Sequence, residues 1–243
     1  MKLWIIPLAG KGTRVKKIGN CKPLIKINGH YILYWFLKGL KTKIKKEDTI
    51  LFITNRTQNS SFLLNSKIKN IVTNNLKIKS KIIIKTIAFT PLGPAMSVFQ
   101  GIKELDLKCE TIIVNHDQFV DFEYPLKKWD AFIPLHYNNN HSSSYVNIKN
   151  KKISKITEKK MTSNYASSGV YGFKTLTLLK KTLTKSFKNK PHFNNEYFIG
   201  PSMKFLININ KSIVPVKTIY KFELGSIKGI TLFKKFIKLF SDG

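Results

Sequence analysis

Short apolar runs alternate with amphipathic segments along the first 120 residues. The continuous apolar runs, at 3–8, 49–54, 81–89 and 110–115, predict strands that are buried on both faces. Apolar positions at helical spacing predict helices over 31–40 and 95–105. Strands of this kind, alternating with helices, predict an α/β fold with a doubly wound, mostly parallel, Rossmann-like sheet. In such sheets the functional loops follow the carboxyl ends of the strands.

The pattern changes after residue 120. The segments with a recognisable pattern are strands at 131–135, 169–173 and 212–219, a hairpin over 145–156 and a helix over 195–207. These predict a small α+β insertion in one domain. Residues 229–240 predict a closing amphipathic helix, with Phe233, Phe236, Ile237 and Phe240 on one side.

The charge of the chain is unusual. Its 43 Lys and Arg residues oppose 13 Asp and Glu residues, for a net charge of +30. Such a charge suggests nucleic acid or an anionic membrane as partner. However, Arg14 and Arg56 are the only arginines, whereas nucleic-acid readers depend on Arg. An excess of Lys, Asn, Ile and Phe is what an A+T-rich genome produces, so we interpret most of the charge as compositional drift and keep a functional basic surface as the alternative.

The remaining composition favours a cytoplasmic protein. Cys21 and Cys109 form neither a disulfide framework nor a metal motif. The opening apolar run is too short for a secretory leader, and no run reaches the length of about 18 residues that a membrane span needs. We therefore expect no stable membrane insertion.

Two motifs near the start carry chemistry. The segment Leu8-Ala9-Gly10-Lys11-Gly12-Thr13-Arg14 follows the first strand, where glycines let backbone N–H groups surround an anion. Arg14 was retained in a chain that has almost lost Arg, which points to a function. The segment Cys21-Lys22-Pro23-Leu24 follows shortly afterwards.

Together these segments resemble the signature of the nucleotidyltransferases that make activated sugars, L-A-G-(G)-x-G-T-R followed by P-K-P-L, with Cys21 in place of the first Pro. Further segments match in the same order over most of the chain: Thr90–Ser97, Val114–Gln118, Thr157–Lys159, Ser168–Phe173 and Phe222–Ser226. Phe193–Phe198 is similar to a stretch found in a branch associated with capsules and surface glycans. The fold implied is a GT-A-like nucleotidyltransferase domain over 1–243, with a nucleotide-binding half (1–120), an acceptor-binding insertion (about 121–220) and a closing metal segment and helix (221–243).

The resemblance implies a role for each matching residue. Arg14, Lys22 and Lys159 would be catalytic cations that neutralise the triphosphate, the leaving group and the incoming phosphate. The nucleotide-binding residues would be Leu8, Ala9, Gly10, Lys11, Gly12, Thr13, Thr90, Gly93, Pro94 and Ala95. The acceptor-binding residues would be Asn115, Glu158, Ser168, Gly169, Asn195 and Glu196. For Glu158 a plain surface charge, and for Asn195 and Glu196 the start of a helix, remain alternatives.

The resemblance also implies Mg²⁺ as cofactor, held by Asp117 and Glu223. Glu223 stands where the family has Asp and is one methylene longer, so a single protein ligand or a displaced ion is an alternative. His116 is expected to be packed, and His136 and His141 to be exposed.

The expected reaction joins a nucleoside triphosphate, with CTP or UTP favoured, to a phosphorylated small-molecule acceptor and releases pyrophosphate. A sugar 1-phosphate for capsule or surface-glycan synthesis is the main expectation. One alternative is a CTP-dependent enzyme for a small non-sugar phosphate such as phosphocholine. Another is a basic binding protein that kept the fold and lost catalysis. No specific nucleic acid is expected as a partner, and a homodimer is compatible with the sequence.

Overall fold

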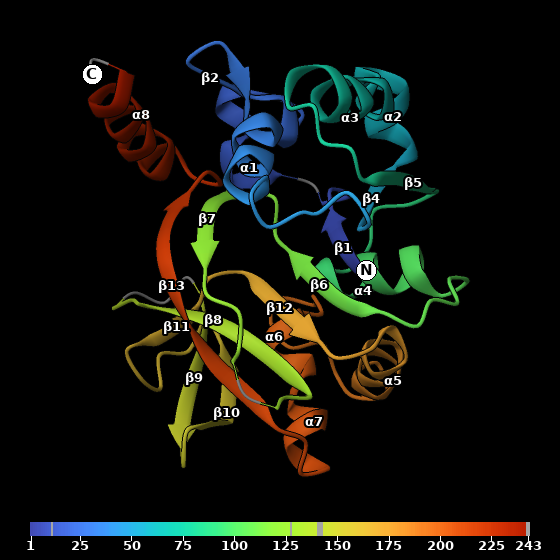
Figure 1. The fold of residues 1–243 in the computed structure, drawn as a ribbon, viewed down its shortest axis with the longest axis vertical. Helices are drawn as coiled ribbons and strands as arrows, with labels where there is room; N and C mark the ends of the chain where they lie inside the picture. Colours follow the sequence, from blue (N-terminus) through green and yellow to red (C-terminus); the bar gives the residue numbers. More distant parts are fainter. Residues whose placement is uncertain (11, 127, 140–142, 242–243) are drawn as a thin grey trace.

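A parallel sheet lies at the centre of the first half of the chain. The computed structural model describes residues 1–10, 12–126, 128–139 and 143–241, and for residues 13, 14, 16, 240 and 241 it describes the backbone only. The parallel strands are β1 (Lys2–Pro7), β4 (Thr49–Asn55), β5 (Lys81–Ile87) and β6 (Glu110–Val114). They lie in the order β6-β1-β4-β5. The expected mostly parallel α/β sheet is confirmed (Figure 1).

Helices cover both faces of this sheet. On one face lie α1 (Ile32–Leu40), α3 (Leu64–Asn70) and the π-helical turn at Ile71–Asn75, which share a core with Trp4, Ile6 and Phe52. On the other face α4 (Pro94–Ile102) and α5 (Leu176–Ser186) pack on Leu3, Ile5 and Ile53. Alternate side chains of each strand therefore enter different cores, which explains why the strands are apolar on both faces.

The second half continues the same sheet in antiparallel pairs. β12 (Val170–Phe173) pairs antiparallel with β6, and β8 (Ala131–Tyr137) follows beside it. Beyond β8 lie β11 (Tyr165–Ser167) and the hairpin of β9 (Ser144–Lys149) and β10 (Lys152–Glu158). β13 (Ile213–Glu223) runs parallel to β8 and then pairs antiparallel with β7 (Gln118–Phe122). This ladder brings the end of the chain back to the carboxyl end of β6.

Smaller elements complete the fold. They are 3₁₀ segments at Thr13–Ile18 and Lys22–Leu24, the pair β2 (Lys26–Ile27) and β3 (His30–Tyr31), and the helices α2 (Arg56–Phe62), α6 (Ile199–Ser202), α7 (Lys204–Asn208) and α8 (Ile227–Ser241). The sequence pattern gave no indication of α2, α3, α5, β7 or β11.

The helix expected over 195–207 is wrong in its first part. Asn194 and Asn195 both have positive φ (44° and 57°), and Phe193 and Glu196 exchange backbone hydrogen bonds around them. Adjacent residues with positive φ are typical of a tight hairpin turn, and Asn tolerates this conformation well. Helical structure begins only at α6, followed by α7.

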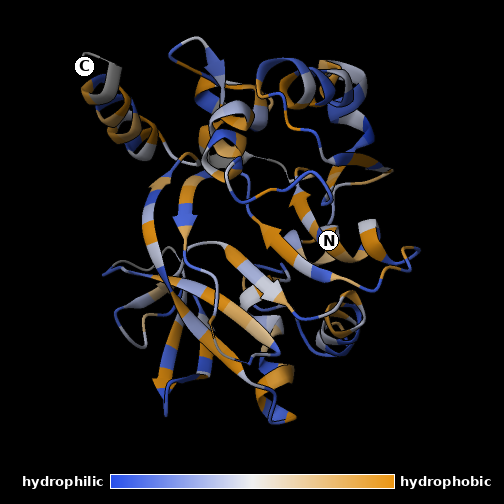
Figure 2. Cartoon of the chain, viewed as in Figure 1, coloured by the Kyte–Doolittle hydropathy of each residue, from blue (hydrophilic) through white to orange (hydrophobic). Residues whose placement is uncertain are grey.

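The closing helix α8 is confirmed and packs on a third core. Phe233 stacks edge-on against Trp35 of α1, with ring centroids 5.5 Å apart, and Ile230 lies in the same core. Figure 1 shows α8 extending from the end of β13 at one corner of the molecule, and Figure 2 shows apolar and polar residues alternating along it. Across the described part of the chain, no helix combines the length and apolar character that crossing a membrane requires.

Candidate active site

The glycine-rich loop after β1 is tied to the neighbouring strand. The side-chain amide of Asn55, at the end of β4, donates to the carbonyl of Ala9 over 3.1 Å, and Gln58 donates to the carbonyl of Gly10 over 3.1 Å. Leu8 and Ala9 are buried. The N–H of Leu8 donates to the carbonyl of Ile53 over 2.8 Å. Beyond Leu8 the loop is anchored through its carbonyls, so its later backbone N–H groups are the feature it can offer an anion.

Gly12 brings this loop against Lys22. Its φ of 64° is left-handed, and a Cβ at this position would lie 3.0 Å from the Cβ of Lys22. Glycine fits both the conformation and the close approach. Lys11 lies outside the described residues, as do the side chains of Thr13 and Arg14, so their expected roles stay predictions.

An ion pair between Lys22 and Asp117 lies at the centre of the candidate site. The Nζ of Lys22 is 2.6 Å from Oδ2 of Asp117, and the two side chains are 10% and 21% exposed. These residues are 95 positions apart and follow the carboxyl ends of β1 and β6. The structure therefore brings together a predicted catalytic cation and a predicted metal ligand.

Glu223 reaches the same place along β13. Its register partner in β7 is Gln118, the residue after Asp117, and the N–H of Leu224 donates to the carbonyl of Asp117 over 2.7 Å. A Cβ on Gly229 would lie 3.0 Å from the Cβ of Glu223, so this side chain leaves the strand beside the first turn of α8. The backbone of the second predicted metal ligand thus lies beside that of the first.

Gly225 lies directly against this ion pair. A Cβ on Gly225 would lie 2.7 Å from Oδ2 of Asp117 and 3.0 Å from Nζ of Lys22, so a larger residue would displace the pair. Among the described residues no three His, Cys, Asp or Glu side chains gather as a metal site. The carboxylates of Asp117 and Glu223 are the donor type that suits Mg²⁺, which takes one or two carboxylates and completes its shell with water and phosphate oxygens.

A second polar cluster lies at the β9–β10 hairpin, around Glu158. The Oγ of Ser144 donates to Oε2 of Glu158 across the hairpin, and the hydroxyl of Tyr171 lies 3.5 Å from the same Oγ. Burial raises the pKa of Glu158 to about 7, against the lowering effects of Ser144 and Lys159, and Glu196 raises it further. Glu158 is consequently a half-buried hydrogen-bonding group, and the alternative of a plain surface charge is wrong.

Lys159 lies beside the turn at 193–196. Its φ is 48°, which directs the side chain away from the line of β10, and its Nζ lies 4.5 Å from the ring centroid of Phe193 and 5.3 Å from that of Phe198. The aromatic faces therefore hold this cation in place, close to the carboxyl of Glu158.

The turn at 193–196 also fixes the loop expected to hold the base. The N–H of Tyr197 donates to the carbonyl of Leu92, and the N–H of Ala95 donates to the carbonyl of Tyr197. Gly93 has a φ of 91°, and a Cβ there would lie 2.5 Å from the carbonyl oxygen of Tyr197. Thr90 is exposed at the start of this loop, and Pro94 begins α4. Asn195 and Glu196 are exposed at the tip of the turn, so the idea that they start a helix is wrong.

The Ser168–Gly169 segment closes over the end of β6. The N–H of Asn115 donates to the carbonyl of Gly169 over 2.9 Å. The Oγ of Ser168 lies 2.5 Å from the hydroxyl of Thr218 and 3.2 Å from Nδ1 of His136. His136 was expected to be exposed, which is wrong, because it is half-buried and burial lowers its pKa to about 3. His141 lies outside the described residues.

The ends of β1 and β6 are also joined directly. Nδ1 of His116 donates to the carbonyl of Pro7 over 2.9 Å. The expectation that His116 is packed is consistent with this contact.

Sequence reasoning missed two polar residues beside the site. Gln118 is 3% exposed and lies under Gly169, and within the described part of the chain its Nε2 has no hydrogen-bond partner. Lys221 lies on β13 two residues before Glu223, and its Nζ is 3.4 Å from Nε2 of His136. Only the position of Gln118 directly after Asp117 was available as a signal.

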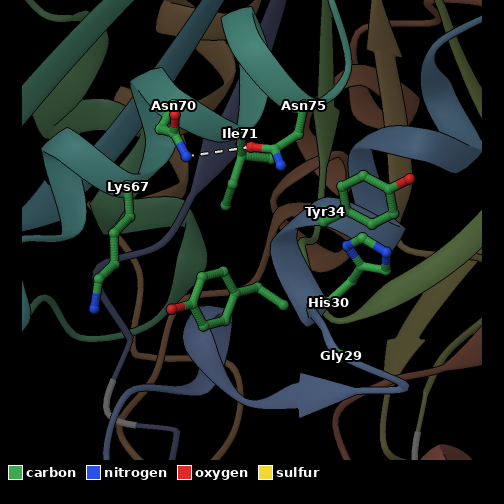
Figure 3. Close-up of a pocket in the computed structure, with 8 residues that line it drawn as sticks. Gly29, His30, Tyr34, Lys67, Asn70, Ile71 and Asn75 are labelled. Carbon is green, nitrogen blue, oxygen red and sulfur yellow. Dashed lines mark hydrogen bonds between the residues drawn. The ribbon is translucent and has the colours of Figure 1, made fainter.

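A small pocket of about 120 Å³ lies outside this site (Figure 3). It is formed by the β2–β3 turn, α1 and α3, and His30 stacks on Tyr34 at its wall with ring centroids 4.1 Å apart. Its lining, which includes Lys67 and Asn70, contains no carboxylate. It therefore lacks the paired cation and carboxylates found at Lys22, Asp117 and Glu223.

The strand order and these loop positions define the α/β fold of the sugar-phosphate nucleotidyltransferases. A nucleoside-diphosphate-sugar pyrophosphorylase from Vibrio cholerae RC9 is similar, with a TM-score of 0.82 and 19% identity over 96% of this chain and 99% of that one. The inositol-1-phosphate CTP transferase from T. maritima has a TM-score of 0.72 and 15% identity over 94% of this chain and 91% of that one. A UDP-glucose pyrophosphorylase complexed with UDP-glucose has a TM-score of 0.74 and 14% identity over 98% of both chains.

At these identities the likeness establishes the fold. No family model matches the sequence, and no curated protein matches it in sequence.

Proposed function

We propose that this chain is a nucleotidyltransferase that joins a nucleoside triphosphate to a phosphomonoester and releases pyrophosphate. The observation that carries the proposal is the partly buried Lys22–Asp117 ion pair, held at the carboxyl ends of β1 and β6, with the backbone of Glu223 paired beside it. The fold shared with nucleotide-sugar pyrophosphorylases supports it. We further propose a sugar 1-phosphate as acceptor, a cytoplasmic location, and a role in capsule or surface-glycan synthesis.

The transfer requires positioning and charge neutralisation. A phosphate oxygen of the acceptor attacks the α-phosphorus, the bond from that phosphorus to the bridging oxygen breaks, and pyrophosphate leaves with the electron pair. Backbone N–H groups of the glycine-rich loop that follows Leu8 hold the triphosphate, and Lys22 lies where charge develops on the leaving group. Lys159 receives the acceptor phosphate.

The acceptor body binds between the two halves. Glu158 accepts a hydroxyl hydrogen from it, while Ser144 fixes the orientation of this carboxylate. Gln118, buried beneath Gly169, supplies an amide donor for the same ligand. The contacts of Tyr197 with Leu92 and Ala95 connect the acceptor turn to the loop against the base.

We propose Asp117 and Glu223 as the residues that hold Mg²⁺. The pairing of Glu223 with Gln118, the residue after Asp117, supports this assignment. When bound, the ion neutralises charge on the phosphate oxygens. Lys22, 2.6 Å from Asp117, orients that carboxylate and keeps its own ammonium at the phosphates.

A CTP-dependent enzyme for a small non-sugar phosphate is the second candidate. It is favoured by the likeness to an inositol-1-phosphate CTP transferase over 94% of this chain. The same residues would perform the same transfer, because the base and the acceptor are read by loop and pocket shape rather than by the ion pair.

The test is pyrophosphate release with each of the common nucleoside triphosphates against a panel of sugar 1-phosphates, inositol 1-phosphate and phosphocholine, in Mg²⁺. The variants are Lys22→Ala and, as a matched control, Lys152→Ala, an exposed lysine of the β9–β10 hairpin whose loss changes net charge equally. We expect Lys22→Ala to lower kcat/KM by about 100-fold or more and Lys152→Ala to leave it unchanged.

Two results contradict the proposal. One is the absence of turnover with every pair of substrates together with unaltered nucleotide binding by Lys22→Ala. The other is an equal loss of activity in the two lysine variants, which would assign the effect to overall charge.

A further inference from the structure

The outer side of α8 carries a stripe of alternating lysines and leucines. Lys228, Leu232, Lys235 and Leu239 have the spacing i, i+4, i+7 and i+11, which places them on one line of the helix. All four are exposed, Leu232 to 52% and Leu239 to 79% of its surface. We call these four residues the α8 stripe.

The α8 stripe lies on a different side of the helix from the residues that pack on the core. Ile230 and Phe233 are buried in the core with Trp35, and Phe236 packs on Phe222 with ring centroids 4.3 Å apart. The helix is therefore held on the core through Ile230, Phe233 and Phe236, on a side that excludes the exposed stripe. Figure 1 shows α8 projecting at a corner of the molecule.

We propose that the α8 stripe docks on the surface of an anionic lipid bilayer. Exposed leucines on a helix enter the boundary between headgroups and acyl chains, while lysines beside them extend their ammonium groups to lipid phosphates. Lys234 and Lys238 are exposed on the same helix and add to the attraction. With 15 residues, α8 lies in the interface rather than across the membrane.

Charge decides between a bilayer and a second copy of the chain. The sequence of α8 contains no Asp or Glu, and each copy carries a net charge of +30. Two such stripes would bring lysines against lysines, whereas an anionic headgroup layer complements them.

Vesicle co-sedimentation of the full chain tests the leucines. Vesicles of phosphatidylcholine with phosphatidylglycerol are compared with vesicles of phosphatidylcholine alone, and binding is expected only to the first. The variant Leu232→Ser/Leu239→Ser is expected to weaken partitioning by about tenfold or more. The control is Leu63→Ser/Leu126→Ser, which removes two exposed leucines elsewhere and should bind like the parent.

A second pair of variants separates the stripe from overall charge. Lys228→Gln/Lys235→Gln is expected to weaken binding about fivefold per lysine. Lys149→Gln/Lys152→Gln, on the β9–β10 hairpin, has the same net charge and should bind nearly as the parent does. The assay does not use nucleotidyl transfer, so its outcome is independent of the proposed activity.

Three outcomes overturn the proposal. They are failure of the parent chain to bind anionic vesicles, equal losses in the stripe variants and their controls, and dimerisation in sedimentation velocity that Leu232→Ser/Leu239→Ser abolishes while vesicles do not bind. The last would assign the stripe to a second copy.

Discussion

At the scale of single residues, the carboxyl of Glu158 is a group whose protonation depends on the fold. Its environment is the inside of the β9–β10 hairpin, where it meets Ser144 and lies near Tyr171. Burial raises the pKa of Tyr171 as well, to about 12, and the charge of Glu158 adds to that rise. The cluster therefore favours a protonated Glu158 until a ligand or a neighbouring cation compensates its charge.

This environment predicts a pH-dependent stability. Because the folded-state pKa of Glu158 is about 7 and the ordinary value is 4.5, the folded chain binds more protons than the unfolded chain between these values. The stabilisation from this group is full below pH 4.5 and is lost as the pH rises to about 7. We expect the free energy of unfolding of the parent chain, relative to Glu158→Gln, to fall over this window in urea titrations.

The prediction would be contradicted if the difference in the free energy of unfolding between the parent chain and Glu158→Gln did not change with pH. A suitable control is Glu104→Gln, since the Glu104 side chain is largely exposed and its pKa is lowered through its hydrogen bond to Lys85. The difference in the free energy of unfolding between the parent chain and Glu104→Gln should rise with pH instead of falling. This change should occur at a lower pH than the change for Glu158.

At the scale of elements, the loop at 90–94 and the turn at 193–196 act as one unit because Gly93 permits their contact. Gly93→Ala would place a Cβ 2.5 Å from the carbonyl oxygen of Tyr197. It would also require alanine to adopt a φ of 91°, which residues with a side chain rarely adopt. We expect a loss of about 2 kcal/mol or more in the free energy of unfolding, measured by urea titration.

The variant Gly29→Ala separates the cost of backbone strain from the cost of a steric clash. Gly29 also has positive φ (78°), but nothing lies within 4 Å of the position of its Cβ. We expect a cost of about 1 kcal/mol from backbone strain alone. Equal costs at the two glycines would show that the contact with Tyr197 does not matter.

The elements also show how far local pattern determines this fold. β1, β4 and β6 are predicted from sequence because each is apolar on both faces, a pattern that local physics fixes. β7 was missed because Asp121 and Gln118 interrupt its apolar pattern, and its pairing with β13 joins residues about 100 positions apart. The helix predicted over 195–207 is wrong at its start because Asn194 and Asn195 have a left-handed backbone. That conformation depends on the turn they form and not on the apolar residues that follow.

The residues of the candidate site also differ in whether the sequence alone could predict them. Lys22, Asp117 and Glu223 were selected by linear motifs; the structure joins the first two in an ion pair and pairs the strand of the third beside Asp117. Gln118, although within a matching motif, and Lys221 were assigned no role, because their importance comes from contacts across β7 and β13 with Gly169 and His136, which no local pattern encodes.

At the scale of the whole molecule, a net charge of +30 surrounds a site whose proposed substrates are both anions. A field of this sign accelerates the approach of anionic ligands whichever lysines produce it, and salt screens it with a Debye length of about 10 Å at 0.1 M. Compositional drift and a functional effect are therefore compatible: the lysines outside the site need no individual role to act on association.

The corresponding prediction concerns kinetics in salt. If the proposed transfer is measured between about 20 and 200 mM ionic strength, kcat/KM for the triphosphate should fall several-fold while kcat stays nearly constant. The variant Lys149→Glu/Lys152→Glu, on the β9–β10 hairpin, lowers the net charge by four without touching the site and should make this salt dependence shallower. A change in kcat would instead indicate that salt acts on the Lys22–Asp117 pair itself, and an unchanged kcat/KM would leave the surplus charge without a kinetic effect on this substrate.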